Sequence, residues 1–240
     1  MPFVAKITLI WLFAGVVGTG CGGLLTFFWR RPSNRSVSLL LGLAGGVMLA
    51  VVVIDLIPQA IFHSNFWYTV LGVFIGLLLL RLMAYSLKRK GERPEYIETG
   101  ILVGLGIALH NFPEGLAIGA GYAATARLGL GLAVVIALHN FPEGLSMATP
   151  MKVGGWSSYQ VLGASLLPGL PMGFGAFCGA VMSNLSPLIL ALNLGVAGGG
   201  MLYIVVYELI PKAYNFRYGL VATCGLIIGL LSGLLLVTFL

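Results

Sequence analysis

Residues 107–116 read IALHNFPEGL, and residues 136–145 read IALHNFPEGL again. Ten identical consecutive residues are hard to attribute to apolar composition alone. In each copy the histidine and the glutamate are four residues apart, which places both on one face of an α-helix, one turn apart. The repeat therefore predicts two adjacent helices that each present a His–Glu pair.

The chain around this repeat has the composition of a membrane protein. Of its 240 residues only 8% are charged, 59% are hydrophobic and the mean hydropathy is +1.02, whereas about 25% of residues are charged in a soluble domain. This composition excludes a disordered chain, a nucleic-acid-binding domain and a conventional soluble enzyme. We expect one transmembrane domain over residues 1–240, with the lipid bilayer as its surroundings and no nucleic-acid partner.

Eight apolar runs are long enough to cross a bilayer, which takes about 20 residues as a helix. They predict an all-α polytopic membrane protein with eight transmembrane helices. The runs cover residues 4–29, 37–62, 66–87, 98–121, 128–149, 156–182, 187–212 and 217–240.

Basic residues are concentrated in alternate loops. The N-terminal segment and the other loops hold only Lys6 and Arg127. Because Lys and Arg are enriched in cytoplasmic loops, this bias predicts an integral protein of the plasma or inner membrane with both termini outside the cytoplasm. The biased loops hold Arg30, Arg31, Arg35, Lys88, Arg89, Lys90, Arg93, Lys152, Lys212 and Arg217.

The repeated motif supplies the ligands that a divalent cation needs. Ionisable residues inside a span are costly and call for a partner or a water-filled path. If the two helices face each other, two imidazoles and two carboxylates surround one point, a set that suits Zn²⁺, Fe²⁺ or Mn²⁺. A structural hydrogen bond between helices is the alternative. The candidate ligands are His110, Glu114, His139 and Glu143.

The motif contains two further features that favour a cation site. Asn111 and Asn140 follow the histidines and could add carbonyl oxygens beside the first site. Pro113 and Pro142 each leave the carbonyl four residues earlier without its helical partner. Such a helix is tolerated at membrane depth where it lines a cavity or pathway.

A second, weaker sequence repeat consists of Asp55–Ala60 (DLIPQA) and Glu208–Ala213 (ELIPKA). The two segments lie in the second and seventh spans, equally far from the centre of the chain. This mirrored placement is what an inverted repeat leaves. Asp55 and Glu208 are candidates for the ion pathway, and the alternative is that they reach interfacial water or a nearby lysine such as Lys212.

The two HNFPEG segments, at 110–115 and 139–144, resemble the helix 4 and helix 5 signatures of the ZIP family of divalent-metal transporters. The resemblance covers essentially the whole chain and is closest to the bacterial-type members without large outer domains. It implies a 3+2+3 arrangement, in which helices 1–3 and 6–8 form an inverted repeat around helices 4 and 5. It also implies metal movement into the cytoplasm, commonly of Zn²⁺ and often of Fe²⁺, Mn²⁺, Co²⁺ or Cd²⁺.

The same resemblance implies roles for individual residues. The two histidines and two glutamates of the motif form the central site, Asn111 and Asn140 belong to an adjacent second site, and Asp55 and Glu208 match acidic residues that line the route in some members.

The sequence departs from the family pattern at three positions. Many members have a glutamate before a proline in helix 6, and here Met172 or Leu170 takes that place, depending on the alignment. A single main metal site is therefore the expectation. Gln59 and Lys212 replace the glutamates of the family's LIPEA segments, and Lys212 would repel cations unless it pairs with an acid.

We therefore expect a divalent-metal uptake transporter that alternates access to a midplane site and is not an enzyme. It needs no prosthetic group, and the metal is its cargo; its glycine-rich helices permit a homodimer. An intramembrane zinc enzyme is one alternative, although the chain has no HExxH motif. A sensor that binds metal without moving it is the other.

Overall fold

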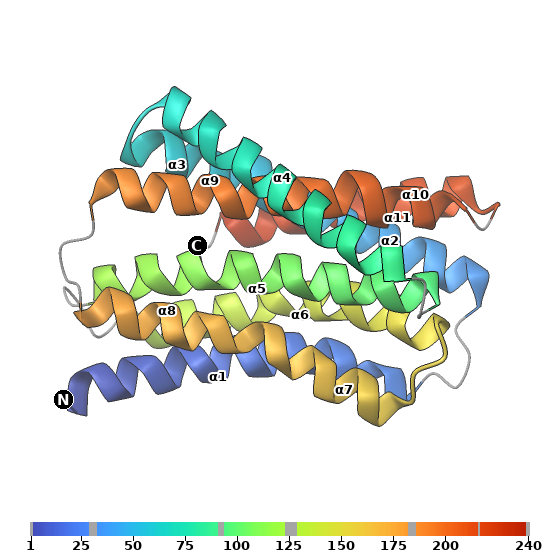
Figure 1. Ribbon diagram of the computed structural model, residues 1–240. Coiled ribbons are helices and arrows are strands. Elements are labelled where there is room, and N and C mark those ends of the chain that lie inside the picture. The colour runs from blue at the N-terminus through green and yellow to red at the C-terminus, as the bar shows by residue number, and fades with distance from the viewer. Residues whose placement is uncertain are drawn as a thin grey trace.

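The computed structural model describes residues 2–28, 33–90, 94–122, 129–181, 186–215 and 217–238. Throughout these residues the regular structure is helical, and eight helical segments run alongside one another (Figure 1). Five are single helices, of which the first four are α1 (Pro2–Leu24, followed by the short 3₁₀ turn η1, Leu25–Phe27), α4 (Phe66–Lys90), α5 (Glu95–Tyr122) and α6 (Gly129–Val153). The last segment is the single helix α11 (Gly219–Val237).

The other three segments are helices with an irregular turn inside them. A π-helical turn, η2 (Val51–Leu56), joins α2 (Asn34–Ala50) to α3 (Ile57–His63), and a second one, η4 (Ile204–Leu209), joins α9 (Pro187–Tyr203) to α10 (Ile210–Tyr214). The 3₁₀ turn η3 (Leu167–Gly169) joins α7 (Ser158–Leu166) to α8 (Leu170–Val181). All eight segments lie where the apolar runs predict them.

Local sequence explains several helix ends. The Ser33 hydroxyl accepts a hydrogen bond from the backbone N–H of Ser36 at the start of α2. Ser157 and Gln160 form a capping box at the start of α7, which satisfies N–H groups that a helix start leaves unpaired. Proline begins α9, where its missing N–H costs nothing.

Six helical segments are long and apolar enough to cross a membrane, among the residues that the structure describes. The eight-span prediction is met in number of helical segments, but α5 and α6 fall outside these six. Both carry the repeated motif, whose His, Asn, Pro and Glu residues lower the hydropathy of any window that contains them.

Two sets of helices make up the bundle. In the first, α1 packs on α6 and α8, and α5 packs on α6 and α8; in the second, α2 pairs with α11 and α4 with α9. The sets meet where α5 contacts α9 and where α2 contacts α6. In Figure 1 α1 and α7 lie below α5 and α6, and α4 and α9 lie above them. The motif helices are therefore central in the bundle.

Glycines allow the paired helices to approach at backbone distance. A Cβ on Gly46 of α2 would lie 2.2 Å from the Leu226 carbonyl oxygen on α11, and one on Gly76 of α4 would lie 2.0 Å from that of Val196 on α9. Close approach through small residues is the usual way in which helices associate in a membrane.

Candidate metal centre

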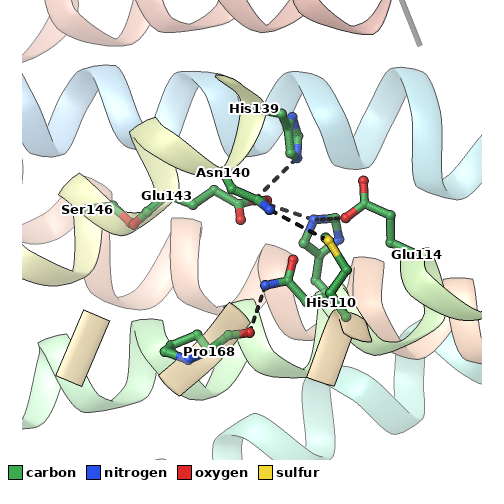
Figure 2. A network of polar contacts seen from close by, with 9 residues as sticks. His110, Glu114, His139, Asn140, Glu143, Ser146 and Pro168 are labelled. Carbon is green, nitrogen blue, oxygen red and sulfur yellow. Dashed lines mark hydrogen bonds and ion pairs between the residues drawn. The ribbon is translucent and has the colours of Figure 1, made fainter. Parts of the chain in front are cut away.

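The two His–Glu pairs of the repeated motif meet between α5 and α6 (Figure 2). His110 Nε2 lies 3.5 Å from Glu114 Oε2 and 3.5 Å from Glu143 Oε1, and His139 Nε2 lies 3.5 Å from the same Glu143 oxygen. The two imidazole rings are 5.6 Å apart between centroids. The four side chains therefore form one connected cluster, in which His110 and Glu143 link the two motifs.

This cluster is buried. His110, His139 and Glu143 are at most 1% exposed, and the Glu114 side chain is 14% exposed. One ligand atom from each of His110, Glu114 and His139 lies within 4.8 Å of the others. Such spacing is short enough for the atoms to share one ion.

Most of the polar atoms in this cluster have no hydrogen-bond partner. Of the buried side-chain nitrogen and oxygen atoms without a partner in the described residues, nine belong to the two motifs and two lie elsewhere. Each such atom costs about 1–3 kcal/mol if nothing binds it. A set of unpaired imidazole nitrogens, carboxylate oxygens and amide oxygens is complementary to a cation.

Close helix contacts fix the glutamates. Gly115 follows Glu114, and a Cβ there would lie 2.1 Å from the Met172 carbonyl oxygen on α8. Gly144 follows Glu143, and a Cβ there would lie 2.0 Å from the Thr19 carbonyl oxygen on α1. Each motif helix is thus pressed against a supporting helix at the residue after its glutamate. Both α5 and α6 continue through their prolines, Pro113 and Pro142.

The two asparagines are oriented by the segment that contains η3. Asn111 Nδ2 donates a hydrogen bond to the Pro168 carbonyl oxygen at 2.7 Å, and Asn140 Nδ2 lies 4.0 Å from Met172 Sδ (Figure 2). Both Oδ1 atoms are buried and unpaired. Because the amide nitrogens are held from the far side, the oxygens remain available as ligands.

Met172, rather than Leu170, stands beside this cluster. Met172 is fully buried and contacts Asn140, whereas Leu170 is 48% exposed. A neutral thioether, rather than a carboxylate, therefore lies beside this cluster.

Asp55 and Glu208 each lie in one of the two π-helical turns, three residues before a proline. Neither belongs to the His110–Glu114–His139 group. Asp55 is half-buried and accepts a hydrogen bond from Gln59 on the next turn. Glu208 is fully buried, and its Oε2 accepts hydrogen bonds from Lys212 Nζ at 2.9 Å and from Thr99 Oγ1 at 3.1 Å.

Sequence reasoning missed two features of this second region. The π-helical turns were not predicted, although an acidic residue three positions before proline marks both of them. Glu208 contacts Lys212, which is the alternative that the sequence left open for it, but the second partner of Lys212 was missed: Glu95 of α5, whose Oε1 lies 3.2 Å from Lys212 Nζ. The spacing of Lys212 four residues after Glu208 was a readable signal, but the approach of Glu95 was not.

Membrane-length helices packed around a buried, largely unpartnered His/Glu/Asn cluster define a polytopic helical membrane protein whose centre is suited to a cation. Residues 86–240 match the family model described as ZIP Zinc transporter. The chain belongs to the ZIP transporter family, whose members are integral membrane proteins.

Individual relatives agree with this assignment. The chain is 30% identical to "Zinc transporter ZupT" of Akkermansia muciniphila, with 95% of each chain covered. It is 31% identical to "Zinc transporter ZTP29" of Arabidopsis thaliana, with 84% of this chain and 83% of the relative covered. It is 36% identical to "Zinc transporter GufA" of Myxococcus xanthus, with 69% and 68% covered. These relatives are named as transporters rather than as enzymes.

Proposed function

We propose that this protein carries a divalent cation, Zn²⁺ in the first place, across the membrane into the cytoplasm through the site on α5 and α6. The observation that carries the proposal is the set of nine buried polar atoms, contributed by the two copies of the motif, that make no hydrogen bond within the described residues. An ion at this point would accept one nitrogen from each imidazole together with carboxylate and amide oxygens.

The charges of the cluster match a divalent ion. Two neutral imidazoles and two carboxylates offer four donors, and the carboxylates offset a charge of +2. The relatives named as zinc transporters make Zn²⁺ the first candidate, and the same donors accept Fe²⁺, Mn²⁺, Co²⁺ or Cd²⁺. Because Met172 adds no negative charge, we propose one main ion, with Asn111 and Asn140 at its side.

The helix contacts support a 3+2+3 inverted repeat. If span 1 corresponds to span 6, 2 to 7, 3 to 8 and 4 to 5, then the pair α1–α6 corresponds to α8–α5, and α2–α11 to α9–α4. The cross-contact α2–α6 corresponds to α9–α5 in the same way. The two π-helical turns fall in corresponding spans. We propose that the two sets of helices rock against each other and expose the site alternately to the two sides of the membrane.

The proposal also includes the path of the ion through the protein and the orientation of the protein in the membrane. Asp55 and Glu208 line the path on either side of the central site, with Glu208 toward the end that carries the basic loops. The basic loops face the cytoplasm, so both termini lie outside it in the plasma or inner membrane. Residues 1–240 act as one transmembrane domain, and the glycine-rich helices permit a homodimer.

Radiolabelled Zn²⁺ uptake into proteoliposomes tests the proposal. The native chain is compared with Glu114→Ala/Glu143→Ala, which removes both carboxylates of the site. We expect saturable uptake by the native chain and none by the double variant. His63→Ala is the matched control, because it removes an imidazole outside the cluster and should leave uptake unchanged.

Other outcomes point to other functions. A folded native protein that binds Zn²⁺ without moving Zn²⁺, Fe²⁺ or Mn²⁺ is a sensor, and the transport proposal is then wrong. Cleavage of a transmembrane peptide that depends on the two glutamates would indicate an enzyme. Uptake that persists in the double variant would place the pathway elsewhere.

A further inference from the structure

Lys212 lies between two carboxylates at one end of α5. Its Nζ is 2.9 Å from Glu208 Oε2 and 3.2 Å from Glu95 Oε1. Glu208 is fully buried, Lys212 is 6% exposed and the Glu95 side chain is 69% exposed. Thr99 Oγ1 also donates to Glu208 Oε2 at 3.1 Å. The charges therefore form a continuous series from the surface into the bundle.

This series lies on the helix that carries half of the metal centre. Thr99 and His110 both belong to α5, and eleven residues of α-helix span about 16 Å. The series thus lies between the centre and the end of α5 that follows the basic residues 88–93. If the chain imports metal as proposed above, an ion that leaves the centre toward the cytoplasm meets these carboxylates on its way out.

Two carboxylates in this position are able to hold a divalent ion. A buried carboxylate requires a cationic or hydrogen-bonding partner, and Glu208 and Glu95 approach a common point, because both lie within 3.2 Å of one nitrogen atom. The ammonium group of Lys212, which is covalently attached to the chain, already occupies that point. A metal ion can bind there only by displacing the ammonium group.

We propose that Lys212 is a tethered competing cation that prevents Glu208 and Glu95 from retaining the metal on its exit. The carboxylates still attract a cation, because the three groups together carry a net charge of −1. The ammonium group limits how long the metal ion stays bound to the carboxylates, since the flexible lysine side chain brings the ammonium group back to them. The inference rests on the proposed function for direction, but its test does not depend on transport.

Equilibrium binding in a chain without the central site is the decisive test. We would purify Glu114→Ala/Glu143→Ala in detergent, add Lys212→Met, and measure Zn²⁺ per chain by mass spectrometry after equilibrium dialysis. We expect one additional bound ion in the triple variant, because the freed carboxylates then bind metal. Lys212→Arg in the same background keeps the charge and should add none. A folded triple variant that gains no ion would overturn the proposal.

A second neutral variant covers the case in which Lys212→Met does not fold. Lys212→Gln keeps an N–H donor beside the buried carboxylate and removes only the charge, and the same gain of one ion is expected. Adding Glu208→Gln to either variant should abolish the gain. If the gain survives Glu208→Gln, the ion binds elsewhere and the proposal is wrong. A merely structural ion pair would lower stability in these variants without adding a metal site.

Uptake by the chain with an intact centre provides an independent measurement. Lys212→Gln should lower the maximal rate about tenfold, which corresponds to about 1.4 kcal/mol, with little change in KM, because retention slows release rather than capture. An unchanged maximal rate would overturn the inference. Absence of uptake by the native chain would instead refute the proposed function, and the binding experiment would still decide the role of Lys212.

Discussion

Gly144 joins the metal centre to the packing of the bundle, because it follows Glu143 where α6 presses against α1. A Cβ at this position would lie 2.0 Å from the Thr19 carbonyl oxygen and 2.7 Å from its carbonyl carbon. These are backbone atoms of a helix, so they cannot turn aside as a flexible side chain would. Gly144→Ala should therefore force α6 and α1 apart by about 1.5 Å, the distance needed to restore ordinary van der Waals contact.

The size of the effect follows from that displacement. Overpacking of this kind costs about 1–3 kcal/mol, and for a chain of this length each kcal/mol lowers Tm by about 2–4 °C. We expect Gly144→Ala to melt about 2–12 °C below the native protein in detergent. Zn²⁺ affinity should fall as well, because Glu143 moves away from the two imidazoles that it contacts at 3.5 Å.

Gly163→Ala is the matched control, since Gly163 is also helical and a Cβ there meets nothing within 4 Å. Its melting temperature should equal the native value or exceed it slightly, because alanine favours helix more than glycine by about 1 kcal/mol. Equal melting temperatures for the two variants would refute the argument, since α6 and α1 would then not be in backbone contact beside the site.

Three further predictions follow from the contacts described above. Zn²⁺ at about 100 times its Kd should stabilise the native protein by about 2.7 kcal/mol, measured as a rise in Tm, and should leave Glu114→Ala/Glu143→Ala unchanged. Glu143→Gln should weaken Zn²⁺ binding more than Glu114→Gln in equilibrium dialysis, because Glu143 contacts both histidines and Glu114 contacts one; the reverse order would contradict the geometry. Thr99→Val should lower stability by about 1–3 kcal/mol in thermal unfolding, since it removes a hydrogen bond to the buried Glu208, whereas Thr8→Val, which removes a bond within α1, should cost less.

The positions of the helices could be predicted from the sequence because each one is an apolar run bounded by polar loops. The meeting of the two His–Glu pairs was predictable provided that the helices face each other, since two copies of one motif in consecutive, antiparallel spans bring the same set of side chains to the middle of the bundle. Local spacing and repetition are sufficient for such features.

Features that depend on contacts between distant segments could not be read in this way. The sequence left Met172 and Leu170 as alternatives because the 3₁₀ turn Leu167–Gly169 interrupts the helix just before them, so a simple helical projection does not say which faces Asn140. The contact of Lys212 with Glu95 joins α10 to the start of α5, and no sequence periodicity relates those positions. The glycine-rich helices could be identified from the composition, but the helices against which those glycines pack could not.

The glutamates in the middle of α5 and α6 have a consequence for biogenesis. A glutamate at the centre of a span costs about 2.5–3.5 kcal/mol on membrane-insertion scales, and α5 and α6 each carry one in the repeated motif. Each therefore gains by entering the bilayer together with the other, so that the polar faces are turned inward before they meet lipid. Assembly of the central pair is then coupled to assembly of the helices around it, and chains in which α1 or α8 fails to dock should be degraded rather than accumulate with an open centre.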